Sequence, residues 1–267
     1  MHPRSSSAPK SSHHSATGAW LTHPGRMRRA NEDACLAGDV LSKGSTDTAT
    51  ALTISGPPWI VAVSDGIGGH HAGAEASQEV VEALAACSPI TPAGVSELLA
   101  KVSRKLCERG RRDPECAGMG ATIAGIASGA RGLFAFNVGD SRVYKFSRQK
   151  LTQVTRDDSE AEELIRAGLI DRDAVRPGYL HALTAAIGGR MEEVKVRTHI
   201  YPLSVATHAR FLVCSDGVTD MLPQSVLQEA LAEEAEARAA VERIFHLAME
   251  AGGNDNITLA VVDVVSV

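Results

Sequence analysis

Apolar residues along this chain gather in short runs that end at glycine, aspartate or serine, as β-strands bounded by turns do. Such runs predict strands at residues 57–66, 119–127, 131–140, 141–147, 210–217 and 255–265. The third and fourth runs meet at a Gly-Asp-Ser sequence, which favours a tight turn, so we expect them to form a β-hairpin. The dominant pattern therefore predicts a protein rich in β-structure.

A second pattern, with apolar residues three or four positions apart, predicts helices. The helical segments are residues 72–87, 95–106, 224–234 and 237–250, and a Gly-Gly pair follows the last of them. Residues 41–58 and 157–183 show neither pattern clearly and are expected to be excursions from the core. Because long helical segments separate clusters of strands, the order predicts an α+β fold rather than a βαβ repeat.

The composition is that of a folded protein, since 44% of the 267 residues are hydrophobic and 22% are charged. Residues 1–15 are polar and lack the apolar stretch of a secretory signal, so we expect a flexible tail followed by a single domain over residues 16–267. No apolar run approaches the roughly 20 residues of a membrane-spanning helix. A net charge of -5 argues against a nucleic-acid partner.

The cysteines give no sign of a zinc site or of a disulfide framework. They are Cys35, Cys87, Cys107, Cys116 and Cys214, an odd number without any Cys-X-X-Cys pair. Reduced thiols of a cytoplasmic protein fit this pattern best.

Aspartates stand at the ends of several predicted strands. They are Asp33, Asp65, Asp140, Asp216 and Asp255. An aspartate next to glycine is ordinary turn chemistry, but Asp65 and Asp216 share the same setting, an apolar run followed by Ser-Asp-Gly. If these strand ends meet at one edge, the carboxylates raise one another's pKa values or recruit cations.

Oxygen ligands of this kind select Mg²⁺ or Mn²⁺ over zinc. Two such ions about 3.5–4 Å apart share a bridging water, lower its pKa and direct it at a phosphoryl group. The glycines that follow Asp65 in the sequence DGIGG allow the backbone to approach the ions. The aspartate pattern therefore indicates hydrolysis of a phosphate ester.

With these motifs the chain resembles the PP2C-type metal-dependent serine/threonine protein phosphatases, in particular the short bacterial ones. The matching motifs occur in the family's order over nearly the whole chain: GRMRRANEDA, SDGIGGHHAGAEAS, GMGATIAG, NVGDSRVY, LTQVTRDDS, LTAAIGG, LVCSDGVTDML and GGNDNITLAVV. The resemblance implies two antiparallel β-sheets packed as a sandwich and flanked by pairs of α-helices, four layers in the order α-β-β-α, with the metals in a cleft at one end. It also implies that residues 157–183 include the flap of the bacterial members.

The resemblance further implies a set of metal-site residues. They are Glu32, Asp33, Asp65, Gly66, Asp140, Asp216 and Asp255. Asp33 and Asp65 correspond to the aspartates nearest the bridged pair of ions, and Gly66 corresponds to a glycine whose carbonyl oxygen is a ligand. Asp140 corresponds to a residue that helps to hold a weaker third ion, and Glu32 to one that reaches a metal through water.

Arg28 corresponds to the arginine that receives the substrate phosphate. A guanidinium group suits this role because it can bind two phosphoryl oxygens at once. Two alternatives remain at this stage: Arg26 or Arg29 takes the role if the register slips, or the whole basic run is simply solvated. The catalytic residues expected from the resemblance are Arg28, Asp33 and Asp65.

Four further residues of the motifs are expected to have supporting roles. Asn256 is expected to orient Asp255 or to cap the turn into the last strand, and Thr122 to be a core residue. Ser141 and Arg142 are expected to hold the turn of the hairpin.

The position of a proposed general acid in many relatives outside bacteria, a histidine, is Ile67 in this chain. Water is then the expected proton donor to the leaving alkoxide, in preference to His70, His71 or His181.

Two other positions depart from the family pattern near the flap. Asp158 stands where the family has histidine, and Ala185 stands where it has arginine. We expect these changes to affect substrate contacts and the third ion more than the two-metal core. Asp158 either repels a phosphopeptide or supplies a further cation ligand, and the sequence leaves both open.

The function implied by the resemblance is hydrolysis of phosphoserine and phosphothreonine by direct attack of a metal-bridging hydroxide, with Mn²⁺ or Mg²⁺. The expected partners are the phosphorylated substrates of a bacterial serine/threonine kinase and the kinase itself, and the expected form is a cytoplasmic monomer. The alternatives are a non-catalytic phosphoprotein-binding module on the same fold, a partner-switching phosphatase of an anti-sigma-antagonist, and a hydrolase of small phosphate esters.

Overall fold

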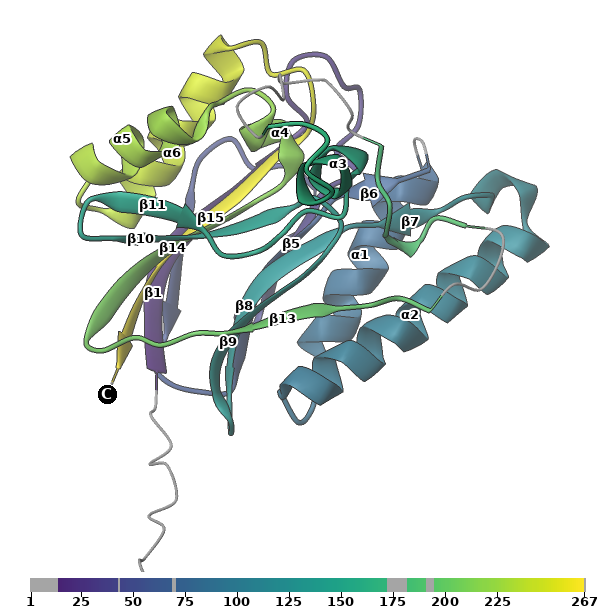
Figure 1. Cartoon of the computed structure of the whole chain (residues 1–267), viewed down its shortest axis with the longest axis horizontal. Helices are drawn as coiled ribbons and strands as arrows, with labels where there is room; N and C mark the ends of the chain where they lie inside the picture. The colour runs from purple at the N-terminus through teal and green to yellow at the C-terminus, as the bar shows by residue number, and fades with distance from the viewer. Residues whose placement is uncertain (1–13, 43, 69–70, 172–181, 191–194, 267) are drawn as a thin grey trace, which may run out of the picture.

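The fold is a sandwich of two antiparallel β-sheets with helices on both outer faces (Figure 1). The computed structural model describes residues 14–42, 44–68, 71–171, 182–190 and 195–266, and the statements below apply to these residues. The α+β class and the layered architecture expected from the sequence are confirmed.

The first sheet, sheet A, joins the two ends of the described chain. Its strands, in spatial order, are β11 (Lys150–Gln153), β10 (Arg142–Ser147), β14 (His208–Cys214), β15 (Ile257–Ser266), β1 (His14–His23) and β4 (Thr50–Ile54). β1 and β15 pair along their whole length, from His14 opposite Ser266 to His23 opposite Ile257. The pairing of chain ends ties the N-terminal strand into the middle of the sheet.

The second sheet, sheet B, lies against the first. Its strands, in spatial order, are β13 (His199–Pro202), β9 (Gly132–Val138), β8 (Ile123–Gly129), β5 (Trp59–Ser64), β2 (Ala34–Ala37) and β3 (Val40–Leu41). A small sheet adjoins it, made of β12 (Ile187–Gly188), β7 (Gly120–Ala121) and β6 (Gly66–Ile67).

A pair of long helices covers each sheet (Figure 1). α1 (His71–Ala85) and α2 (Pro92–Arg112) pack on sheet B, and α5 (Gln224–Glu233) and α6 (Ala237–Glu250) pack on sheet A. The short helices are η1 (Pro114–Cys116), α3 (Glu160–Arg166) and α4 (Asp216–Thr219). None of the helices in the described part of the chain is long and apolar enough to cross a membrane.

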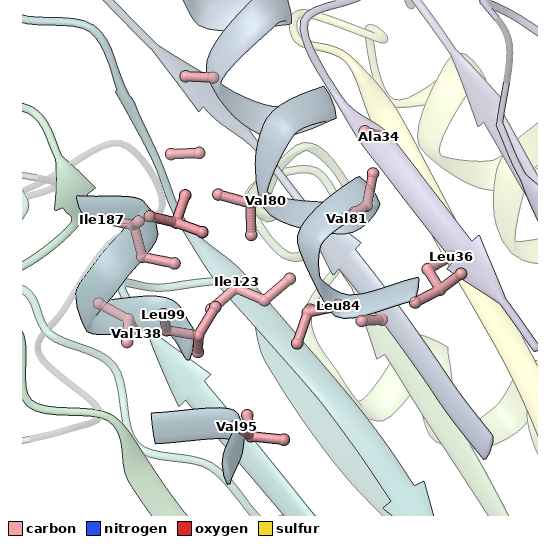
Figure 2. Packing of buried hydrophobic residues seen from close by; sticks show 14 of the residues in the cluster. Ala34, Leu36, Val80, Val81, Leu84, Val95, Leu99, Ile123, Val138 and Ile187 are labelled. Carbon is pink, nitrogen blue, oxygen red and sulfur yellow. The ribbon is translucent and has the colours of Figure 1, made fainter. Parts of the chain in front are cut away.

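Apolar side chains fill each of the three spaces between the four layers. Between the sheets, Trp59 and Val61 of sheet B share a cluster with Phe211 of sheet A. Between α1, α2 and sheet B, Leu84 and Leu99 lie in one buried cluster with the strand residues around them (Figure 2). Burial of apolar surface on both faces of both sheets is the main source of stability of such a fold.

Most predicted elements are confirmed, but the expected hairpin is wrong. β9 pairs with β8 and β13 in sheet B, whereas β10 pairs with β11 and β14 in sheet A. Between them the chain crosses from one sheet to the other, and Gly139 takes a φ of 97° at the crossing. An apolar pattern identifies a strand without identifying its partner, and a turn sequence serves a crossing as well as a hairpin.

Two predicted boundaries also need correction. β4 lies inside residues 41–58, which were expected to be an excursion, because a polar edge strand gives little apolar signal. β1 begins at His14, within the expected tail 1–15, and the His14 side chain is buried. Residues 1–13, and residues 172–181 of the expected flap, lie outside the described residues.

The contribution of the helix layer to stability can be measured at Leu99, which is fully buried against sheet B. We expect Leu99→Ala to lower the free energy of unfolding by about 2–5 kcal/mol, because it removes buried methyl groups and leaves a cavity. Leu169→Ala is the matched control, since Leu169 is 69% exposed, and it should change this free energy by less than about 0.5 kcal/mol. Urea denaturation of both variants checks the difference, and equal effects would contradict the packing described here.

Candidate active site

The strand ends that carry the predicted aspartates meet around one cavity of about 310 Å³. Its lining residues are Arg28, Glu32, Asp65, Gly66, Ile67, Gly68, Asp140, Leu183, Asp216, Asp255 and Asn256. Every residue predicted for the site is therefore at this cavity except Asp33, which lies buried behind the wall. Residues more than 200 positions apart in the sequence are brought together in one place.

Asp33 is a buried carboxylate, with 8% of its surface exposed, and Asp140 is buried to a similar degree. Its Oδ2 accepts a hydrogen bond of 2.8 Å from the Ser215 hydroxyl, whereas Oδ1 has no hydrogen-bond partner among the described residues. Burial raises the pKa of Asp33 to about 7, against the effect of nearby hydroxyl groups, and the charge of Asp216 raises it further. A buried oxygen without a partner is costly, so this carboxylate is suited to a cation that the described side chains do not supply.

The other aspartates of the cavity interact with Asp33 and with one another. Burial raises the pKa of Asp65 well above its usual range, and repulsion from Asp216, Asp33 and Asp140 adds to the effect. Burial and then the charge of Asp216 raise the pKa of Asp140 in the same way. These shifts share one physical origin, which is negative charge concentrated in a poorly solvated place. Divalent cations would remove that cost.

The donor set is suited to a hard cation, although the side chains are not already gathered around one point. Within the described part of the chain, no group of three or more histidine, cysteine, aspartate or glutamate side chains is arranged to hold an ion. Asp255 instead forms an ion pair of 2.7 Å with Arg28. The fit to Mg²⁺ or Mn²⁺ therefore depends on the all-oxygen chemistry of the cavity and on the unpartnered Oδ1 of Asp33.

Gly66 shows why glycine follows Asp65 at the cavity wall. A Cβ at this position would collide with the carbonyl oxygens of Gly73 and Glu32. The backbone of β6 thus passes between the first turn of α1 and the segment that carries Glu32, and no side chain fits there. Gly66, whose carbonyl oxygen is the predicted ligand, lines the cavity.

Arg28 lies on the loop between β1 and β2 and is the arginine that lines the cavity among the described residues. Its Nη2 donates to Asp255 Oδ2, and this hydrogen bond is the largest cause of the raised pKa of Arg28. Its side chain is 54% exposed, so a ligand entering from solvent can reach the guanidinium group. Arg26 and Arg29 are exposed and do not line the cavity.

Asn256 has a larger role than the sequence indicated. Its backbone N–H donates to Asp255 Oδ1 at 2.8 Å, as expected of a residue that orients Asp255. Its side chain, however, holds the loop that carries Arg28: Nδ2 donates to the carbonyl oxygens of Pro24 and Ala30. Oδ1 accepts from the backbone N–H of Glu32 at 2.7 Å. One amide side chain thus fixes both ends of this loop.

Thr122 is a core residue by burial, as predicted, and it also organises the site. Its hydroxyl accepts from the backbone N–H of Asp65 at 3.2 Å and lies 2.7 Å from the Ser141 hydroxyl. It therefore connects the end of β5 to the crossing that carries Asp140. A threonine in an apolar strand was the available signal, because a buried hydroxyl needs a partner.

Three expectations around the flap have clear outcomes in the structure. Arg142 does not hold a hairpin turn, because its guanidinium forms a bidentate pair with Asp157 at 2.6–3.1 Å. Ala185 packs against the apolar cluster of sheet B. Ile67 lines the cavity, so an apolar side chain lies where many relatives are expected to have a histidine. His70 and His181 lie outside the described residues, and the side chain of His71 is not described.

Comparison with known proteins adds independent evidence. Residues 45–258 match the family model described as protein phosphatase 2C. The chain is 32% identical over 213 residues to the serine/threonine protein phosphatase PstP of Mycobacterium tuberculosis, and the match covers 77% of this chain and 40% of PstP. It is 29% identical over 252 residues to the serine/threonine phosphatase stp of Listeria monocytogenes, covering 91% of this chain and 93% of that protein. The chain thus spans less than half the length of PstP.

Among solved structures, a crystal structure of the catalytic domain of PstP in complex with two manganese ions is similar. It matches with a TM-score of 0.75 at 29% identity, over 95% of this chain and all of that one. The family match covers most of the chain and includes Asp65, Gly66, Asp140, Asp216 and Asp255. On this evidence, the chain belongs to the protein phosphatase 2C family.

Proposed function

We propose that this chain hydrolyses phosphoserine and phosphothreonine esters in proteins, with two Mn²⁺ or Mg²⁺ ions in the core of the site. The observation that carries the proposal is the cavity where Asp65, Asp140, Asp216 and Asp255 meet beside Arg28. The names of the relatives and the manganese ions of the similar crystal structure support it.

The proposed ligands are the carboxylates of Asp33, Asp65, Asp216 and Asp255 and the carbonyl oxygen of Gly66, with Glu32 acting through water. Asp140 is the proposed ligand of a weaker third ion. When bound, such ions neutralise phosphoryl oxygens and lower the pKa of a water molecule that attacks phosphorus directly. The unpartnered Oδ1 of Asp33 and the mutual repulsion of the aspartates support this assignment.

Arg28 binds the phosphoryl group of the substrate. Its guanidinium reaches the cavity and is paired with Asp255. A phosphoryl group with two negative charges is a stronger partner for a guanidinium than one carboxylate, so it can replace Asp255. The Asn256 side chain holds the loop on both sides of Arg28, so the guanidinium is positioned before the substrate arrives. Ile67 has no proton to give, and the leaving alkoxide takes its proton from water.

The proposed partners are phosphoproteins, namely the substrates of a cognate serine/threonine kinase and the kinase itself. All five cysteines are unpaired, which supports a cytoplasmic site of action. A binding module without catalysis is the main alternative, and the first experiment below decides between them.

Asp216→Ala tests the aspartate cluster directly. We expect turnover of a phosphothreonine peptide with Mn²⁺ to fall by at least about a hundredfold, because one carboxylate facing both Asp33 and Asp65 is removed. Asp39→Ala is the control, since Asp39 is an exposed turn residue, and it should keep full activity. A wild-type protein that binds the phosphopeptide but never hydrolyses it would favour the binding module.

Arg28→Ala tests the phosphate contact. We expect KM for the phosphopeptide to rise about tenfold or more, with a smaller change in kcat, because the contact is present before and during the reaction. Arg29→Ala and Arg26→Ala are the matched controls, and each should change KM less than about twofold. A larger effect at either control would move the phosphate site to that residue.

The raised pKa of Asp33 makes the effect of metal on stability depend on pH. In the metal-free protein this pKa is about 7, against an ordinary value of 3.8 for an aspartate, so the stability contribution of Asp33 is full below about pH 3.8 and is lost as pH rises through about 7. Mn²⁺ binding must displace the proton, so its affinity should rise over the same range.

Thermal unfolding at pH 5.5 and pH 8, with and without Mn²⁺, measures this linkage. We expect a larger increase of Tm by Mn²⁺ at pH 8, and calorimetry in two buffers should show proton release at pH 6. Equal stabilisation at both pH values without proton release would contradict the buried, protonated state of Asp33.

A further inference from the structure

Asp158 lies at a junction of three segments next to the cavity, although it does not line the cavity itself. Its Oδ2 accepts from the backbone N–H of Gly139 at 3.0 Å, and its own N–H donates to the Gly139 carbonyl at 2.9 Å. Its Oδ1 lies 2.8 Å from Nε2 of His199 on β13. Both carboxylate oxygens thus have partners within the protein, which argues against Asp158 as a further cation ligand.

The third segment is the chain that returns to the cavity wall. The carbonyl oxygen of Asp158 accepts from the backbone N–H of Thr184 at 2.9 Å. Ser159 forms an isolated antiparallel bridge with Leu183, and Leu183 lines the cavity. A shift of Asp158 would therefore reach Leu183 on one side and, through Gly139, its neighbour Asp140 on the other.

Side chains on one face of sheet B form hydrogen bonds to the segments of this junction. His199 and Tyr201 are two residues apart on β13 and so point to the same face. The Tyr201 hydroxyl accepts from the backbone N–H of Arg156 at 3.0 Å. Asn137, opposite His199 on β9, donates from Nδ2 to the carbonyl oxygens of Gly139 and Arg156. Unlike these contacts to the backbone, the bond between Asp158 and His199 joins two side chains.

We propose that the Asp158–His199 pair is a positioning device, which holds Asp140 and Leu183 in place at the cavity and thereby sets the affinity of the weakest metal site. The two side chains are only 14% and 12% exposed, so water competes poorly for the bond. Without the His199 donor, Asp158 Oδ1 is left without its partner, and the carboxylate turns away from Gly139. Asp140 then loses the fixed backbone from which its side chain reaches the cavity.

The predicted change in metal affinity rests on the proposed metal-dependent function. The predicted positioning of Gly139, Asp140 and Leu183 does not, and it can be measured without metal. In His199→Ala we expect amide exchange at Gly139 to become at least about tenfold faster, with faster exchange also at Asp140 and Thr184. His199→Gln keeps a side-chain donor and should restore most of the protection. Amide exchange by NMR on the full chain without metal gives this comparison.

Calorimetric titration with Mn²⁺ alone gives the second comparison. The dissociation constant of the weakest binding step should rise about three- to tenfold in His199→Ala, and the tighter steps should change less than about twofold. The matched control is His208→Ala, which removes another histidine–aspartate pair, with Asp263, at the far end of β14 from Asp216. This control should change neither exchange at Gly139 nor Mn²⁺ affinity.

Unchanged exchange at Gly139 in His199→Ala would overturn the proposal, and so would faster exchange with unchanged Mn²⁺ affinity at every step. If His199→Ala loses its structure, seen as a large fall in Tm, the test is made on His199→Gln and the wild-type protein instead. In that comparison, any increase in the exchange rate at Gly139 must be accompanied by weaker Mn²⁺ binding. If the wild-type protein fails to hydrolyse phosphopeptides, the proposed function fails, but exchange and Mn²⁺ titration still decide this inference.

Discussion

Repulsion among buried carboxylates is the constraint around which this structure is arranged. Burial alone raises the pKa values of Asp33, Asp65 and Asp140, and each of them also feels the charge of Asp216. Left to itself, such a cluster favours protonation or separation of the strands that carry it. The fold holds the cluster together because the apolar layers beside it bury far more surface than the site, and divalent cations remove the remaining cost.

Several of the groups that hold the cluster in place are neutral. Ser215 donates to Asp33, Thr122 bonds to the backbone of Asp65, and Asn256 holds the loop of Arg28. A neutral donor fixes the orientation of a carboxylate without cancelling its charge, so the negative potential that attracts cations is retained. Charged partners occur at the rim, where Arg28 binds Asp255, and one step further out, where Arg142 binds Asp157. This order is what a preorganised metal site requires.

The sequence predicted which carboxylates gather at or beside the cavity because each aspartate stands at the end of a strand, and the strand signal is local. Asp65 and Asp216 could be placed at strand ends from apolar runs of six and seven residues, and Asp33 from the shorter run that follows it. Pairing between strands is not local, which is why the hairpin at Gly139 was wrong. The supporting contacts of Asn256 and of Asp158 with His199 could not be predicted either, because they join side chains far apart in the chain and leave no periodic pattern.

The crossing at Gly139 has a consequence for the chemistry. Asp33 and Asp65 lie at the ends of strands of sheet B, Asp216 and Asp255 lie at the ends of strands of sheet A, and Asp140 lies on the segment that passes between the sheets. The distance between the carboxylates of the two sheets is therefore set by the apolar cluster between the sheets, around Trp59 and Phe211. Since protein interiors are close-packed and transmit strain, a change in the packing of this layer would also change the geometry of the aspartate cluster. A hairpin at residues 131–147 would have left Asp140 at the edge of one sheet. The crossing instead places Asp140 between the sheets, where it can face carboxylates of both.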